Sequence, residues 1–525
     1  ASNTAVGGFA LDANTTANYN IGIGYNALTT EASGEKNVAI GHAALEDSNG
    51  GNFNTAVGYG SLRNSTTADN NTAFGYHTLV TNTTGASNTA VGFGSLDANT
   101  TGGFNVGLGQ SALTDNTTGG SNVAIGVSAL GTNSTADFNT AVGRDALAAN
   151  TTGHSNVAVG ALALDANTTG LGLTAVGYNA ATTMTTGGAE TVAIGFEALK
   201  LATATGNTAV GYKAGTSIST GEDNCFIGNF AGDATTTADN NTALGAFSLS
   251  ANTTGELNTA VGANALDANT TGARNTALGE FALSANTTAS FNTGLGSSSL
   301  GLNTTGASNT AVGHNSLQDN TTGSENVAIG KSALANNTTA GENTAVGQNA
   351  LLTNTTGAAN TALGKSSLAS NTTASNNTAI GKSALGANTT GIQNVAVGSA
   401  ALDAGVGASD NTAIGFEALT TETGGQNNVA IGTRSLQNQV NSSGNIYNTA
   451  VGSNAGQAIT TGGQITALGG NALKSTTTGG ANTALGYAAL ESNTTAANNT
   501  AVGYSALTAN TTGGTNTALG AEALL

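Results

Sequence analysis

The sequence contains no proline, no tryptophan and one cysteine, and it has few charged residues. Only 8 % of its 525 residues are charged, whereas about 25 % is usual in globular domains. The single cysteine, Cys225, excludes a disulfide framework and a thiolate metal cluster. Eleven basic and 29 acidic residues give a net charge of −18. Because phosphate recognition needs clustered Lys and Arg, we expect no nucleic-acid partner.

Long apolar segments are missing as well. No run of 18 apolar residues occurs, so we expect no membrane insertion. Disorder is disfavoured because 38 % of the residues are hydrophobic, whereas disordered chains combine low hydrophobicity with high net charge. The 77 glycines and the small side chains favour a fibre or a repeat protein.

The chain is a tandem repeat with a period of 17 residues. Units begin at residues 3, 20, 37 and 54 and onward, and 31 starts can be placed. The consensus is Asn-Thr-Ala-(Val/Ile/Leu)-Gly-x-x-(Ala/Ser)-Leu-x-x-Asn-Thr-Thr-Gly-x-x, numbered here as positions 1 to 17. Position 5 is glycine in every unit, which suggests a positive φ or a close backbone approach there. The residues that we single out as structural are Gly7, Gly24, Gly41, Gly58, Gly262, Val57, Leu62 and Leu266.

The repeat predicts an all-β fold, a parallel β-solenoid or β-roll of about 31 coils of 17 residues. Two packed helices do not fit into 17 residues, and the Thr, Asn and Gly content opposes helix. Leucine-rich repeats need 20–29 residues, and collagen needs glycine at every third position. We expect residues 1–525 to form one continuous repeat domain.

The charged residues predict which positions face solvent. All of them fall at positions 6, 7, 10, 11, 12, 16 or 17, except Glu190. We therefore interpret positions 1–5 and 8–9 as short strands, and the variable positions outside these segments as exposed bends. Both faces of positions 1–5 lack charge in all 31 units. Because alternate strand residues point to opposite faces, this favours burial of the outer face against another chain over simple avoidance of stacked like charges.

Two regions depart from the period. The zone 173–240 contains an 18-residue unit followed by a 16-residue unit, and Gly215 and Gly232 replace the leucine of position 9 in adjacent units. This predicts a thinned core and a local weak point, with Ile218 as a candidate to replace the missing leucine beside Gly215. A 20-residue coil spans 428–447. We also expect the fibre to continue beyond Ala1 and Leu525, since the chain shows no capping, anchor or chaperone domain.

Strand segments such as Asn37-Val38-Ala39-Ile40-Gly41 and Asn326-Val327-Ala328-Ile329-Gly330 resemble the head repeats of trimeric autotransporter adhesins. The fuller unit from Asn54 to the Thr-Thr turn resembles the shafts of bacteriophage tail fibres. The resemblance covers essentially the whole chain and implies a left-handed parallel roll assembled as a homotrimer. Head repeats of that family are usually shorter, so the extra Asn-Thr-Thr-Gly turn is a departure.

No chemical site is predicted: we expect no catalytic residues, no metal and no cofactor. Four histidines lie in separate units, the acidic residues are dispersed, and Cys225 replaces a threonine at position 2. The Asn-Thr-Thr triplets match the N-glycosylation acceptor, but their fixed register favours a turn ladder. The histidines are His42, His77, His154 and His314.

The sequence therefore favours a structural, non-enzymatic fibre that is extracellular, on a cell surface or on a virion, and that is adhesive. Its expected partner is itself, as a homotrimer and in a head-to-tail filament, with a surface glycan or host receptor as a further candidate. Exposed aromatics of the shaft, Tyr59, Tyr76 and Phe93, are the expected surface contacts. The alternatives are an ice-binding β-solenoid, with exposed threonine columns, and a polysaccharide-acting β-solenoid enzyme, with clustered carboxylates.

Overall fold

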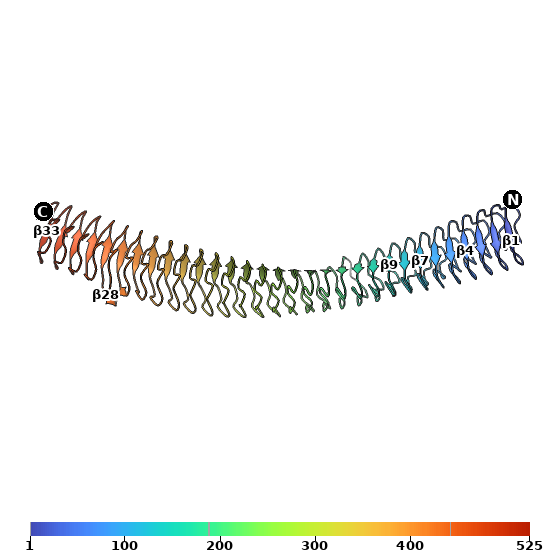
Figure 1. The fold of residues 1–525 in the computed structure, drawn as a ribbon, viewed down its shortest axis with the longest axis horizontal. Helices are drawn as coiled ribbons and strands as arrows, with labels where there is room; N and C mark the ends of the chain where they lie inside the picture. The colour runs from blue at the N-terminus through green and yellow to red at the C-terminus, as the bar shows by residue number, and fades with distance from the viewer. Residues whose placement is uncertain (1, 187–189, 442) are drawn as a thin grey trace. The chain divides into compact units, whose positions relative to one another are not determined.

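The computed structural model describes residues 2–186, 190–441 and 443–525, and these residues form a parallel β-solenoid. The described residues contain strands and turns but no helix. The chain divides into two compact units, Ala1–Asn258 and Thr259–Leu525. Each coil contributes one short strand to the main sheet, and in both units consecutive strands of this sheet lie side by side (Figure 1). The predicted fold class is confirmed.

In the first unit, the described residues contain fifteen strands, one from each coil. They are β1 (Thr4–Val6), β2 (Ile21–Ile23), β3 (Val38–Ile40), β4 (Thr55–Val57), β5 (Thr72–Phe74), β6 (Thr89–Val91), β7 (Val106–Leu108), β8 (Val123–Ile125), β9 (Thr140–Val142), β10 (Val157–Val159), β11 (Thr174–Val176), β12 (Val192–Ile194), β13 (Thr208–Val210), β14 (Cys225–Ile227) and β15 (Thr242–Leu244).

The second unit is built in the same way and adds a two-stranded sheet, β26 with β28, at the long coil. Its strands are β16 (Thr259–Val261), β17 (Thr276–Leu278), β18 (Thr293–Leu295), β19 (Thr310–Val312), β20 (Val327–Ile329), β21 (Thr344–Val346), β22 (Thr361–Leu363), β23 (Thr378–Ile380), β24 (Val395–Val397), β25 (Thr412–Ile414), β26 (Gly425–Gln426), β27 (Val429–Ile431), β28 (Gly444–Asn445), β29 (Thr449–Val451), β30 (Thr466–Leu468), β31 (Thr483–Leu485), β32 (Thr500–Val502) and β33 (Thr517–Leu519).

Neighbouring coils pair in register, so each repeat position forms a column. In β4 and β5, for example, Thr55 lies opposite Thr72 and Val57 opposite Phe74. The strand covers only positions 2–4, and the middle residue points inward: Ala56 is fully buried, whereas Val57 is half-buried on the outer face. Positions 2 and 4 thus form two outward columns, and position 3 forms an inward column.

Positions 8 and 9 are turns, so their interpretation as a strand was wrong. The leucines of position 9 have φ between 48° and 54°, in the left-handed region, yet Leu62 and Leu266 are fully buried. Leucine disfavours this conformation. Burial of a whole leucine side chain stabilises by about 1.5–3 kcal/mol and offsets that strain. Tertiary packing therefore overrides the local preference at this position.

The glycine column of position 5 combines a positive φ with a close approach between coils. Across the column φ lies between 127° and 144°. A Cβ built on Gly58 would lie 2.1 Å from the carbonyl oxygen of Gly75 in the next coil, and one on Gly262 would lie 2.6 Å from the oxygen of Gly279. Gly7, Gly24 and Gly41 have the same geometry. Any side chain here would have to enter the space of a neighbouring backbone.

Two ladders of buried asparagines stabilise the coils from inside. At position 12, Asn99 Nδ2 donates to Asn82 Oδ1 of the previous coil at 2.8 Å and to the Gly102 carbonyl at 3.0 Å. At position 1, Asn88 Nδ2 donates to the same Gly102 carbonyl at 2.9 Å. Position 12 was expected in an exposed bend, but Asn82 and Asn99 are fully buried. The ladder that the fixed register of the triplets predicts is thus present, and it occupies the side-chain nitrogens that glycosylation would modify.

Where the leucine of position 9 is missing, another side chain fills the core. Phe226, at position 3 in β14, is fully buried, and a Cβ built on Gly232 would lie 2.5 Å from its ring. Ile218, at position 12, is buried beside Gly215, and Ile459 takes the same place beside Gly456. The core at Gly215 and Gly232 is therefore filled, contrary to the thinning predicted from the sequence. Part of this zone, 187–189, lies outside the described residues, as does residue 442 of the 20-residue coil.

Candidate functional site

The residues expected to make surface contacts belong to one stack of rings, which we call the aromatic ladder: Phe9, Tyr25, His42, Tyr59, Tyr76 and Phe93. Five of these rings stand at position 6 of consecutive coils, and Phe9 stands at position 7 of the first. The ring centroids of Tyr59 and Tyr76 are 5.3 Å apart, and those of Tyr76 and Phe93 are 5.2 Å apart. The planes of these pairs deviate from parallel by 11° and 3°. The coil repeat therefore sets the stacking distance.

The geometry of the ladder determines which parts of its rings can meet a ligand. Because neighbouring rings stack on one another, their faces are largely occupied, and each such pair contributes about 0.5–1.5 kcal/mol. The outer edges stay accessible: Tyr59 is 47 % exposed, Tyr76 45 % and Phe93 57 %. The ladder thus offers solvent a row of ring edges and tyrosine hydroxyls. Such a row suits contact with an extended surface better than enclosure of a small ligand.

Stacked aromatics recur elsewhere on the same columns. In the first unit, Tyr178, Phe196 and Tyr212 stack at 5.4 and 5.3 Å, and the row continues through Phe230 to Phe247. In the second unit, Tyr487 and Tyr504 stack at 5.8 Å. Sequence reasoning placed these residues on the surface but missed the stacks. The signal was available, since aromatics at one position of consecutive repeats must become neighbours once the coils pair in register.

The outer face of the sheet is a second candidate surface. Position 4 exposes Val91, Ile125 and Leu244 by 37 %, 38 % and 45 %, and Phe74 by 55 %. Position 2 is mostly threonine and is half-buried or exposed. In each unit this face carries an apolar column beside a hydroxyl column, and neither column contains a charged residue.

Two glutamates at position 12 are fully buried, although sequence analysis interpreted this position as exposed. Glu31 accepts hydrogen bonds from the amides of Ser33, Gly34 and Gly50 and from Ser48 Oγ. Amide donors replace a cation here, so the carboxylate belongs to the internal ladder.

Glu422 repeats this solution in the second unit. It accepts from the amides of Thr423 and Gly425 and of Asn441 in the long coil, and from Gln439 Nε2. The charge of both glutamates is thus used inside the solenoid, and neither is available to an external ligand.

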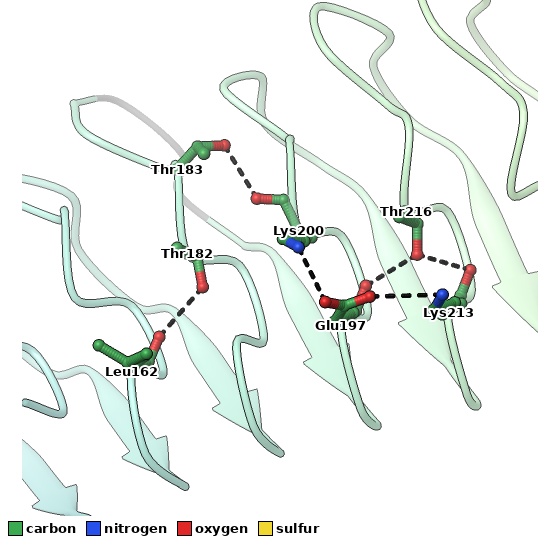
Figure 2. A network of polar contacts seen from close by, with 7 residues as sticks. All are labelled: Leu162, Thr182, Thr183, Glu197, Lys200, Lys213 and Thr216. Carbon is green, nitrogen blue, oxygen red and sulfur yellow. Dashed lines mark hydrogen bonds and ion pairs between the residues drawn. The ribbon is translucent and has the colours of Figure 1, made fainter. Parts of the chain in front are cut away.

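The coils around the 18-residue unit are joined on the surface by a polar network (Figure 2). Glu197 lies between Lys200 Nζ at 2.8 Å and Lys213 Nζ at 3.6 Å. Thr216 Oγ1 donates to the carbonyls of Glu197 and Lys213, both at 2.9 Å. The hydrogen bond from Lys200, with a smaller opposing effect of burial, holds the pKa of Glu197 below its ordinary value. Exposed ion pairs of this kind contribute little individually, so we assign the network a structural role.

Five aspartates at position 10 have their pKa raised, chiefly because partial burial disfavours the charged carboxylate. They lie in five different coils, and no two of these coils are adjacent within a unit. Within a unit, no two of the five carboxylates therefore face each other. They are Asp97, Asp165, Asp233, Asp267 and Asp403.

The histidines and the cysteine do not converge. His42 and His77 stack against tyrosines of the aromatic ladder. His154 and His314 lie on other coils, and Cys225 is half-buried in β14. Within the described ranges, no group of three or more His, Cys, Asp or Glu side chains could hold a metal ion. That part of the chain also holds no helix long and apolar enough to span a bilayer.

No protein-family model matches the chain, and no curated protein is significantly similar to it. The resemblance to adhesin heads and tail-fibre shafts therefore rests on the repeat motif and on the parallel solenoid.

Proposed function

We propose that the chain is the shaft of a non-catalytic, adhesive fibre outside the cell or on a virion, and that it assembles with further copies of itself through the outer face of its sheet. The observation that carries this proposal is the pair of charge-free columns at positions 2 and 4. The variable positions 6, 7, 16 and 17 carry most of the charged residues. A face that excludes charge in coil after coil, while its neighbours accept charge, is typical of a surface that is covered.

A homotrimer is the assembly that the resemblance favours, and closed cyclic symmetry would bury the apolar column of every subunit. The per-coil core is thin: each coil buries one leucine or its substitute, while the large residue of position 4 stays outside. Burial of that residue between chains would add roughly 25 cal/mol for each Å² removed from water. Assembly into a head-to-tail filament would use a second contact, independent of the interface within the trimer.

Charge introduced on the outer face tests the proposal. In the variant L295K/V312E/I380K/V397E, each Lys–Glu pair stacks in adjacent, registered strands, so repulsion within the coil is avoided. The matched control S297K/H314E/S399E places charges at position 6 of the same coils, where Lys382 already supplies the fourth. Light scattering should give about three chains per particle for the wild type and the control, and folded monomers for the variant, with circular dichroism confirming the fold. A wild-type monomer at micromolar concentration would contradict the proposal.

The threonine column supports a second candidate, an ice-binding solenoid. Thr72 and Thr259 are exposed in the single chain, as that function requires. Measurement of thermal hysteresis separates the two functions. An ice-binding rod would be active as a monomer, and T259K/T276K would abolish the activity, whereas a fibre shaft would show none.

A further inference from the structure

A shallow hollow of about 280 Å³ lies on the first unit where two consecutive coils turn. One coil contributes Thr135, Asp137 and Phe138, and the next contributes Thr152 and His154. These residues stand at positions 14, 16 and 17, on the opposite edge of the repeat from the aromatic ladder at positions 6 and 7. The hollow thus combines a ring, a carboxylate, two hydroxyls and an imidazole on the variable columns.

The polar groups of the hollow are held by the backbone. The Gly120 amide donates to Asp137 Oδ1 at 2.6 Å, which fixes the carboxylate beside the ring. His154 Nδ1 lies 3.3 Å from Ser155 Oγ. Phe138 is 65 % exposed, and both threonines are exposed. An oxygen-rich rim around an open ring favours a ligand that donates hydrogen bonds.

Other coils of this chain show what the same ring accepts. Phenylalanine stands at position 17 in four coils. The ring of Phe53 has Lys36 Nζ at 4.7 Å from its centroid, and the ring of Phe291 has the Arg274 guanidinium at 5.7 Å; each cation comes from position 17 of the preceding coil. The corresponding residue before Phe138 is Ser121, which cannot supply a cation. The ring of Phe138 is thus equivalent to two rings that are each covered by a cation of the chain itself.

The adjacent carboxylate strengthens the preference for a cation. Asp137 precedes Phe138 directly, whereas Phe104, two coils away and 69 % exposed, follows Gly103. A ring quadrupole and a carboxylate attract the same organic cation. The net charge of −18 adds a long-range attraction for cations and a repulsion for anions.

We propose that the hollow at Asp137 and Phe138 binds an external primary ammonium or guanidinium group between the Phe138 ring and the following coil. The contacts of Lys36 and Arg274 from the preceding coils show that the equivalent rings accept such groups. The ammonium lies over the Phe138 ring, Asp137 supplies the counter-charge, and the hydroxyls of Thr135 and Thr152 accept its remaining hydrogens. Two sources carry this chemistry, a lysine or arginine of a partner protein and an amino sugar. The proposal deepens the adhesive role proposed above and rests on it for its biological meaning.

The experiment titrates the full-length protein, labelled with ¹³C in its phenylalanine rings, with two matched pairs of probes. One pair is tetralysine and its fully Nε-acetylated form, and the other is a glucosamine tetramer and the corresponding N-acetylglucosamine tetramer. We expect saturable shifts of the Phe138 ring with the cationic member of each pair, at least tenfold weaker binding of the acetylated member, and weakening by added salt. Binding of tetralysine alone assigns a protein partner, and binding of the glucosamine tetramer alone assigns an amino sugar.

Variants separate the site from general attraction to an acidic protein. D137N and F138L should each lower the affinity at least fivefold. The control D69N removes a carboxylate from the same repeat position, where Asp69 accepts from the Asn52 amide at 2.6 Å but stands beside Asn70 instead of a ring. It should leave binding unchanged, as should F53A, whose ring is already covered.

Several results would overturn the proposal: equal binding of acetylated probes, which would indicate a neutral glycan; equal losses in D137N and D69N; or no shift at Phe138 with millimolar probe. Particle mass is measured on the same samples. Trimers that do not bind cations would contradict only this inference, whereas monomers that bind cations would contradict only the proposed assembly.

Discussion

The filled core at Phe226 offers a sharp test of how the solenoid tolerates irregular coils. Position 3 is alanine in almost every coil, and position 9 is leucine. In the coil that contains β14 the sizes are exchanged, with Phe226 at position 3 and Gly232 at position 9. The ring is fully buried, and its Cε2 atom would lie 2.5 Å from a Cβ on Gly232. The two residues therefore share one space, and each should be tolerated only with the other.

The magnitudes follow from that geometry. F226A removes a buried ring and should destabilise the coil by about 3–5 kcal/mol. G232L adds a side chain to occupied space and should cost about 1–3 kcal/mol. A leucine at this φ is not itself new, since the leucines of position 9 have φ near 50°. The double variant restores the consensus, so we expect it within about 1.5 kcal/mol of the wild type. The coupling free energy is then at least about 2.5 kcal/mol.

Native-state hydrogen exchange is the suitable assay, because long repeat arrays do not unfold in two states. The reporters are two amides that join neighbouring coils, that of Gly232, which donates to the Ser248 carbonyl at 2.9 Å, and that of Gly228, which donates to the Val210 carbonyl at 2.8 Å. Their opening free energies in the wild type, the two single variants and the double variant give the coupling free energy of the double-mutant cycle directly.

A distant control shows whether the coupling is local. In the double variant F226A/L62A the two changed residues lie in coils that share no contact, so the two losses of stability should add within about 0.5 kcal/mol. If F226A/G232L is as unstable as the sum of its single variants, the exchange of sizes is not the reason why this coil tolerates glycine at position 9.

Four further predictions concern the other columns. G262V should destabilise its coil by about 3 kcal/mol or more, because the new Cβ meets the backbone of the next coil and the φ of this residue is 129°. The control K365A lies at an exposed position, so it should change the melting temperature by an amount equivalent to less than about 0.5 kcal/mol. N99A should lower the local opening free energy in native-state hydrogen exchange by about 1–3 kcal/mol, since it breaks the buried amide ladder. Burial raises the pKa of Asp97, so the protonated carboxyl stabilises the fold at low pH, and this contribution is lost as the pH rises through that pKa. D97N should therefore raise the melting temperature at pH 7. It should not raise it below pH 3.8, the ordinary pKa of aspartate. The lowered pKa of Glu197 has the opposite sign, so E197Q should lower the melting temperature at pH 7 and lose its effect as pH falls through that pKa.

The sequence predicts the coil because two features of the repeat obey simple physics. A glycine that recurs at one position implies an unusual φ or a close approach, and Gly58 has both. An in-register repeat implies a parallel ladder, which the pairing of Thr55 with Thr72 shows. The period and the residue type suffice to predict the glycine column and the parallel ladder, without knowledge of the turns.

The turns were predicted less well, because local preference and tertiary packing conflict there. Position 9 was interpreted as a strand because it carries no charge in any unit, yet Leu62 adopts a φ of 51°, which leucine disfavours, and its side chain lies in the core. Position 7 carried a usable signal: it also has a positive φ, and it is rich in asparagine, serine and glycine, such as Asn26 and Gly60. These residue types tolerate that region.

Charge misled the interpretation of position 12. Glu31 and Glu422 made this column look solvated, whereas amide donors from two coils enclose both carboxylates. Both glutamates follow two threonines and precede a glycine by three residues. In each case the free amides of the turn point at the carboxylate, so a single charged residue in an otherwise uncharged column can mark an internal anion site instead of an exposed surface.

The placement of chemistry follows from the stacking itself. A residue inside the coil or on the sheet must fit its equivalents in both neighbouring coils, so positions 1, 3 and 5 vary little from coil to coil. Only the columns at the edges are free to differ from coil to coil, and these carry the aromatic ladder on one edge and the Asp137–Phe138 hollow on the other. Variation among coils, more than their average, therefore locates the surfaces on which ligand specificity can arise. On this argument, the coils that interrupt a regular column are the first to examine for binding.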